Sequence, residues 1–214
     1  QSTRIGLSIL TLLRNSGSQA AIHSGLIYAC KLIDERTSPD QKLVVVVMDS
    51  DGEDRPEDIQ LLIDGLLSSA SDASVAARQH RVSSKSFKVF YFLYKCIFKL
   101  LTGRTINFGN FMALTPLAAR RLSKTSETRS HLPATLLQSK LKFVAVGLDR
   151  GQRYDGKSKM NLIDLMSHGC KGLAIFTNDL LIRVGLAAMT LLLSFLLMGT
   201  LILLSKFLGI STPG

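Results

Sequence analysis

An uncharged apolar segment near the C-terminus places the strongest constraint on what this chain can fold into. No Asp, Glu, Lys or Arg occurs from Val184 to Ser205, and Arg183 and Lys206 flank the segment. About 20 consecutive apolar residues are enough to cross the hydrocarbon core of a bilayer as a helix. A buried helix of this length in a soluble domain usually carries a polar face. The sequence therefore predicts a transmembrane helix over residues 183–208.

A second feature organises the part that precedes this helix. An apolar, mostly β-branched run from Leu43 to Met48 ends in a cluster of carboxylates that begins with Asp49 and Asp51. An apolar run without polar alternation is typical of a strand that is buried on both faces. Ligands of open α/β sheets bind outside the carboxyl ends of the strands. We therefore expect Asp49 and Asp51 to lie at a ligand site.

Two carboxylates one residue apart at a strand end favour a hard divalent cation. Mg²⁺ and Mn²⁺ prefer oxygen ligands and often take one or two carboxylates together with substrate phosphates. The alternative is a solvated acidic turn before a helix that starts at Pro56. An EF-hand is disfavoured, because Gly52 comes too early in the loop and a strand precedes the acids where a helix is required.

Strand and helix patterns alternate along the chain before the apolar segment. The expected strands cover residues 5–13, 43–48, 73–77, 106–114 and 143–148. The expected helices cover residues 18–32, 56–67, 85–101, 117–123, 132–141 and 160–179, the last with a break near His168 and Gly169. Such alternation predicts an α/β domain with a mostly parallel sheet and helices on both faces.

The net charge of +10 is concentrated in one region. Ten lysines and arginines and no acidic residue lie between Ala73 and Ser126, and aromatic residues are interleaved with them. No nucleic-acid-binding signature accompanies this pattern. A basic amphipathic helix rich in Phe and Leu fits an anionic membrane surface better, so we expect a membrane partner and no nucleic acid. The three cysteines form no CxxC pair and no zinc set.

Four short motifs occur in order along the chain. They are Asn15-x-Gly17 with Ala21 and Gly25-Leu26, the run Asp49-Ser-Asp-Gly-Glu-Asp-Arg-Pro-Glu57, Gly109-Asn110-Phe111, and Arg153-x-x-Gly156-x-Ser158-Lys159. Together they resemble the family-2 glycosyltransferases of the dolichyl- and polyprenyl-phosphate sugar synthase type. Many relatives carry Asp where this chain has Asn110.

The resemblance implies a Rossmann-like GT-A fold that moves a sugar from a UDP- or GDP-sugar to a polyprenyl phosphate, with inversion at the anomeric carbon. It implies that Asp49 and Asp51 hold Mg²⁺ or Mn²⁺. The catalytic residues that it implies are Asp51, Asn110, Arg153 and Lys159. The donor-binding residues that it implies are Asp49, Ser50, Asp51, Glu53, Arg78, Arg153 and Lys159. The alternative for Arg153 and Lys159 is an exposed basic loop.

The resemblance also divides the chain into three parts. Residues 1–158 correspond to a partial GT-A domain, residues 159–182 to amphipathic juxtamembrane helices, and residues 183–208 to the membrane span. The first strands of the family, which hold the nucleoside, have no counterpart here. We therefore expect this chain to be part of a longer protein.

Two other functions stay open at this point. A processive polysaccharide synthase shares the Asp-x-Asp pattern, but such chains carry Gln-x-x-Arg-Trp and this sequence has no Trp. A membrane-tethered interaction module without catalysis would make the acidic loop incidental. The positive-inside rule places the basic domain in the cytosol, and the resemblance favours a bacterial plasma membrane. The sugar is not determined, and a homo-oligomer is left open.

Overall fold

The computed structural model describes residues 6–35, 43–78, 85–154 and 162–209. Four strands, two short 3₁₀ helices and seven α-helices lie in these ranges. In chain order the elements are α1 (Ser18–Glu35), β1 (Val45–Val47), η1 (Pro56–Asp58), α2 (Ile59–Ser68), β2 (Ala73–Arg78), α3 (Lys85–Thr102), β3 (Phe108–Leu114), α4 (Pro116–Ser123), η2 (Ser126–Arg129), α5 (Leu132–Gln138), β4 (Phe143–Leu148), α6 (Leu162–Ala174) and α7 (Thr177–Phe207).

The four strands form one mixed sheet in the order β1-β3-β2-β4. Strand β2 pairs in parallel with β4, whereas β3 is antiparallel to both of its neighbours, β1 and β2. The α/β class is confirmed, but the prediction of a mostly parallel sheet is wrong. A parallel strand needs a crossover helix that lies on the sheet. The helix before β3 is α3, which packs against α6 and α7 and does not lie on the sheet. The chain therefore re-enters the sheet at the edge where β2 ends, and β3 runs antiparallel to β2.

Helices cover both faces of the sheet, as expected. On one face, Val75 and Met112 pack under α1, α4 and α5 in the main hydrophobic cluster. On the other face, Phe111 and Ala113 pack against Leu62 and other residues of α2. Neighbouring residues of β3 therefore belong to opposite cores, which is the alternation that a pleated strand imposes.

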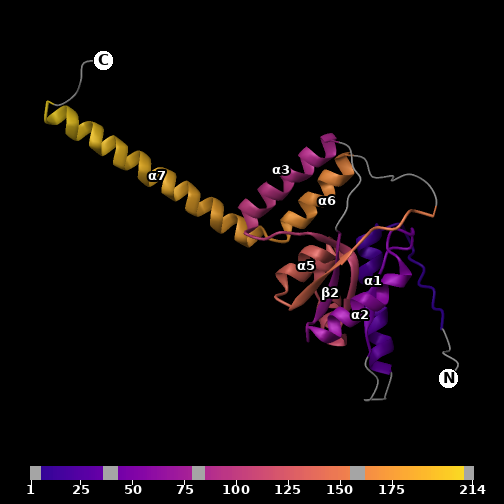
Figure 1. The fold of residues 1–214 in the computed structure, drawn as a ribbon. Coiled ribbons are helices and arrows are strands. Elements are labelled where there is room, and N and C mark those ends of the chain that lie inside the picture. Colours follow the sequence, from indigo (N-terminus) through magenta and orange to yellow (C-terminus); the bar gives the residue numbers. More distant parts are fainter. Residues whose placement is uncertain (1–5, 36–42, 79–84, 155–161, 210–214) are drawn as a thin grey trace.

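Helices α3 and α6 lie side by side, and α7 projects away from the domain (Figure 1). A third hydrophobic cluster joins α3, the end of α6 and the α6–α7 connection to α5. Within it Phe98 of α3 meets Phe176 edge to face at 5.6 Å between ring centroids. The Arg104 guanidinium lies 5.2 Å from the same Phe176 ring and pairs with Asp179 at the start of α7. These contacts attach α7 to the domain.

Helix α7 is the one helix in the described ranges that is long and apolar enough to cross a membrane. At 1.5 Å per residue its 31 residues measure about 46 Å, more than the roughly 30 Å of a hydrocarbon core. None of its most apolar window is buried against the rest of the chain. The helix is consistent with membrane association.

Two further expectations are corrected. Residues 6–13 form no strand, because an extended segment becomes a strand only beside a partner; Leu7, Ile9 and Leu13 are largely exposed.

Helix α6 continues through His168 and Gly169, and the break falls at Ile175 and Phe176. The side chains of these two residues are buried in the third cluster. Residues 177–182 therefore belong to the same helix as the predicted span.

Candidate functional site

The candidate site lies where β1 and β4 end. Although the sheet is mixed, β1, β2 and β4 run in one direction, because only β3 between them is reversed. Their carboxyl ends therefore share one edge. The acidic loop 49–54 follows β1, and the loop 149–154 follows β4. Asp49 and Asp51 therefore follow a strand that ends at this shared edge, although the sheet is mixed.

The acidic loop is a tight turn held by its own carboxylates. The buried Asp54 accepts a hydrogen bond from the backbone N–H of Asp49 at 3.0 Å, so it closes the loop. Asp51 accepts one from the N–H of Glu53, also at 3.0 Å, through Oδ1. Gly52 has a φ of +89°, a conformation that residues with a Cβ rarely adopt. The turn holds both Asp49 and Asp51 in the loop that follows β1.

The loop after β4 lies directly against the acidic loop. The N–H of Gly151 donates to the carbonyl oxygen of Glu53 at 2.9 Å, and the N–H of Tyr154 donates to that of Asp51 at 3.0 Å. A Cβ on Gly52 would lie 2.9 Å from the Tyr154 ring, and a Cβ on Gly151 would collide with the Gly52 carbonyl oxygen. Both glycines are therefore needed for this close approach.

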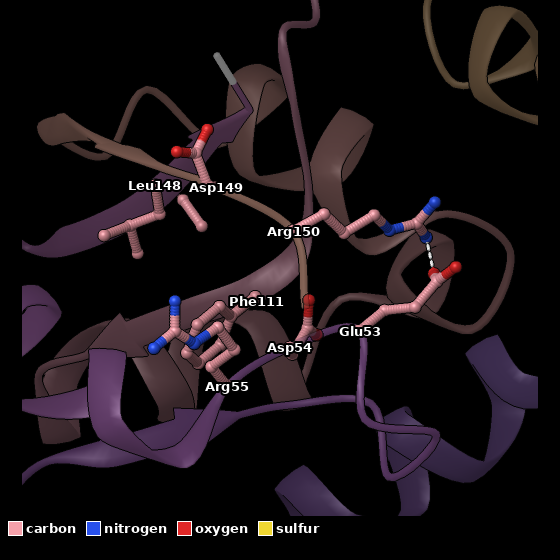
Figure 2. Close-up of a pocket in the computed structure, with 8 residues that line it drawn as sticks. Glu53, Asp54, Arg55, Phe111, Leu148, Asp149 and Arg150 are labelled. Carbon is pink, nitrogen blue, oxygen red and sulfur yellow. Dashed lines mark ion pairs between the residues drawn. The ribbon is translucent and has the colours of Figure 1, made fainter. Parts of the chain in front are cut away.

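Two arginines of the second loop form ion pairs with the first. Arg153 Nη2 lies 3.2 Å from Asp51 Oδ2, and Arg153 Nε donates to Glu53 Oε1 at 2.9 Å. Arg150 pairs with the other carboxylate oxygen of Glu53, and Figure 2 shows this ion pair among the residues that line a small pocket. Burial lowers the pKa of Arg150 below its ordinary value, and Arg153 adds to this, whereas Asp51 and Asp49 oppose it.

The residues present fit a divalent cation with few protein ligands. In the described ranges no three His, Cys, Asp or Glu side chains converge on one point. The Asp49 carboxylate forms no hydrogen bond or ion pair with a described residue, although its charge raises the pKa of Arg150, and Asp51 is two residues further along the same turn. Mg²⁺ and Mn²⁺ commonly use one or two carboxylates and complete their coordination with phosphate oxygens and water. Asp49 and Asp51 could hold such an ion when a diphosphate is bound.

The other predicted site residues are distributed differently. Ser50 is exposed in the acidic loop, and Glu53 bridges both arginines. Arg78 ends β2, with its backbone paired to Leu148; its side chain is outside the described part, as is the whole of Lys159. Asn110 lies in β3 and accepts a hydrogen bond from Gln19 of α1 at 3.0 Å. No described hydrogen bond joins Asn110 to the acidic loop.

A second, open pocket of about 310 Å³ lies at the N-terminus of α1. Ser16, Gly17, Ser18, Gln19, Ala20, Arg129, Ser130, His168 and Lys171 line it. Its walls are the N-terminus of α1, the end of η2, and α6. No acidic residue is among the described lining residues, and neither Arg129 nor Lys171 forms an ion pair with a described residue.

The N-terminus of α1 adds to the positive character of this pocket. The first intrahelical hydrogen bond runs from Ala21 N–H to Gly17, so the preceding amides have no partner within the helix. Asn15 Oδ1 accepts from the Gly17 N–H at 3.0 Å, which orders the turn in front of α1. Unpaired amides at a helix N-terminus attract anions. With Arg129 and Lys171 beside them, the pocket is suited to an anionic group.

Several residues of the acidic-loop site and of the second pocket were not predicted from the sequence. Arg150 could have been predicted as a site residue, since it follows the expected strand 143–148 by two residues. Arg129, Lys171 and Gln19 could not have been predicted in this way, because they come from three separate helical elements and no local pattern relates them.

A scan against protein-family models finds no match for this chain, and no curated protein matches it. The resemblance to glycosyltransferases therefore rests on the four motifs.

Proposed function

We propose that this chain is an inverting, membrane-anchored glycosyltransferase of the polyprenyl-phosphate sugar synthase type. The observation that carries the proposal is the contact between Asp51 and Arg153. These residues belong to two separate motifs, and nothing local in the sequence requires the motifs to meet. The proposal includes a GT-A fold, and it is supported by three strands of one direction that end at the same edge of the sheet and by helices on both faces.

The chemistry requires stabilisation of a leaving nucleoside diphosphate. As the bond between the anomeric carbon and the diphosphate oxygen breaks, negative charge grows on the leaving group. A divalent cation on Asp49 and Asp51 would supply charge neutralisation there. Arg153 and Arg150, which both contact the acidic loop, would bind the same phosphates, since a guanidinium can bind two phosphate oxygens at once. Glu53 holds both arginines near the acidic loop.

The second pocket supports a phosphate acceptor. A phosphate monoester is anionic at neutral pH, so its oxygen can attack the anomeric carbon without a strong general base. Arg129, Lys171 and the α1 N-terminus offer the positive environment that such a group needs. Gln19 lines this pocket and also bonds Asn110, the neighbour of Phe111 in the first pocket. The two pockets are therefore linked through β3.

The position of this pocket favours a lipid acceptor. His168 and Lys171 belong to α6, and the chain passes from α6 through a two-residue break into α7. A phosphate bound there lies beside the helix that leads into the apolar span, where a polyprenyl chain would be dissolved. We propose the cytosolic face of a bacterial plasma membrane as the working location.

The test is a transfer assay with the complete open reading frame in detergent. The reaction contains undecaprenyl phosphate, Mn²⁺ and a panel of labelled UDP- and GDP-sugars, and it measures label in an organic-extractable product. We expect transfer from one donor, loss of transfer in Asp51→Asn, and a raised KM for the lipid in Arg129→Gln. Arg120→Gln is the matched control, since Arg120 pairs with Asp34 on α1 instead of facing either pocket.

Absence of transfer from every donor by protein that binds Mn²⁺ and nucleotide would move the acceptor away from polyprenyl phosphate. Absence of both metal and nucleotide binding would contradict the catalytic proposal, and a membrane-tethered interaction module would then be the remaining hypothesis. An unchanged lipid KM in Arg129→Gln would remove the second pocket from the mechanism.

A further inference from the structure

We propose that Arg153 is a built-in counter-ion of the acidic loop, which a divalent cation must displace from Asp51 before it can bind. The inference rests on the proposed function for the cation itself. It goes further in giving Arg153 two positions, one on the acidic loop and one on the donor diphosphate.

The geometry shows why the two cations compete. Asp51 has two carboxylate oxygens: Oδ1 accepts from the Glu53 N–H at 3.0 Å, and Oδ2 lies 3.2 Å from Arg153 Nη2. A divalent cation shared with Asp49 needs one of these oxygens. The bond to Oδ1 is internal to the turn that shapes the loop. Oδ2 is therefore the oxygen that Asp51 would offer to a cation, and Arg153 pairs with it.

Charge also opposes simultaneous binding. The acidic loop carries four carboxylates, those of Asp49, Asp51, Glu53 and Asp54, and two guanidinium groups, Arg150 and Arg153, pair with them. A guanidinium beside Asp51 cancels part of the negative charge that attracts a divalent cation and repels the cation directly. Withdrawal of Arg153 restores the full charge of Asp51.

The second loop can release Arg153 without leaving the site. The backbone hydrogen bonds from Gly151 to Glu53 and from Tyr154 to Asp51 do not involve the Arg153 side chain, and Arg150 keeps its own contact with Glu53. The guanidinium can therefore turn to a diphosphate while the loop stays docked. A diphosphate that draws Arg153 away favours the cation, and by linkage the cation favours the diphosphate to the same degree.

The test is Mn²⁺ binding to the detergent-solubilised protein without nucleotide, measured from the electron paramagnetic resonance of free Mn²⁺. We expect Arg153→Gln to bind Mn²⁺ up to about fivefold more tightly than the wild type, the upper end of what an exposed ion pair contributes. Arg153→Lys keeps the charge but cannot bridge Asp51 and Glu53 together, so its affinity should fall between the two. Arg120→Gln removes an Arg–Asp pair elsewhere and should leave Mn²⁺ affinity unchanged.

The outcomes separate this inference from the function on which it rests. Equal or weaker Mn²⁺ binding by Arg153→Gln, with binding lost in Asp51→Asn, would overturn the counter-ion and keep the metal site. No Mn²⁺ binding by the wild type and by either Arg153 variant would overturn the counter-ion, and it would overturn the metal site as well only if Mn²⁺ also fails to bind in the presence of UDP. Tighter binding by both Arg153 variants, with the gain in affinity absent when UDP is added, would establish the displacement.

Discussion

His131 should make the domain sensitive to mild acid. Its side chain is 5% exposed, and Nδ1 accepts a hydrogen bond from the Ala134 N–H at 3.1 Å, which caps the N-terminus of α5. Its ring stacks on His168 of α6 with centroids 4.4 Å apart. Burial lowers the pKa of His131 from 6.5 to about 4, and the neighbouring His168 contributes in the same direction.

The direction and the size of the change in stability follow from the ordinary pKa and the lowered pKa of His131. The unfolded chain takes up the proton near pH 6.5, whereas the folded chain resists it until about pH 4. The stabilisation is therefore complete above pH 6.5 and is lost as the pH falls to 4. The change in pKa corresponds to roughly 3 kcal/mol of unfolding free energy. For a chain of this size, that is a fall in Tm of about 6–12 °C.

Thermal unfolding in detergent at pH 7 and pH 4 measures this, with His131→Asn as the control. Asn is a good N-cap and can accept from the Ala134 N–H, but it does not titrate. Carboxylates contribute to acid sensitivity in both proteins, so the difference between them isolates the histidine. The wild type should lose about 6–12 °C more than the variant on acidification. An equal loss in both proteins would refute the assignment of a buried, neutral His131.

Two other predictions concern single positions. Ser74 Oγ is buried without a hydrogen-bond partner among the described residues. Ser74→Ala should therefore raise the unfolding free energy by about 1 kcal/mol, measured by chemical denaturation. A decrease in the unfolding free energy would contradict this prediction. Gly52→Ala should lower the unfolding free energy by about 2 kcal/mol, because Gly52 has a φ of +89° and an added Cβ would crowd the Tyr154 ring. It should also expose Arg153 to trypsin; an unchanged Tm and cleavage pattern would argue against the interlocked loops.

Local patterns in the chain were enough to locate most of the elements. The expected strands 73–77, 106–114 and 143–148 agree with β2, β3 and β4 to within two residues at each end, because alternation and apolar runs are properties of neighbouring residues. The apolar segment likewise became part of one long helix, α7. The carboxylates of Asp49 and Asp51 do follow a strand, as the abrupt change from apolar to acidic residues predicted.

Other features depended on contacts between distant parts of the chain. The direction of β3 follows from where α3 packs, and an apolar strand has the same pattern in either direction. Residues 6–13 have a strand pattern but no partner in the described structure, so they form no strand.

The same limit applies to the site. Asp51 and Arg153 meet only because β1 and β4 end at the same edge. Arg129 and Lys171 face one pocket only because η2 and α6 both pack against α5. Spacing along the chain determines which residues can share an element. Which elements share a surface is determined by the burial of all the hydrophobic clusters at once, and this joint packing assembles both pockets.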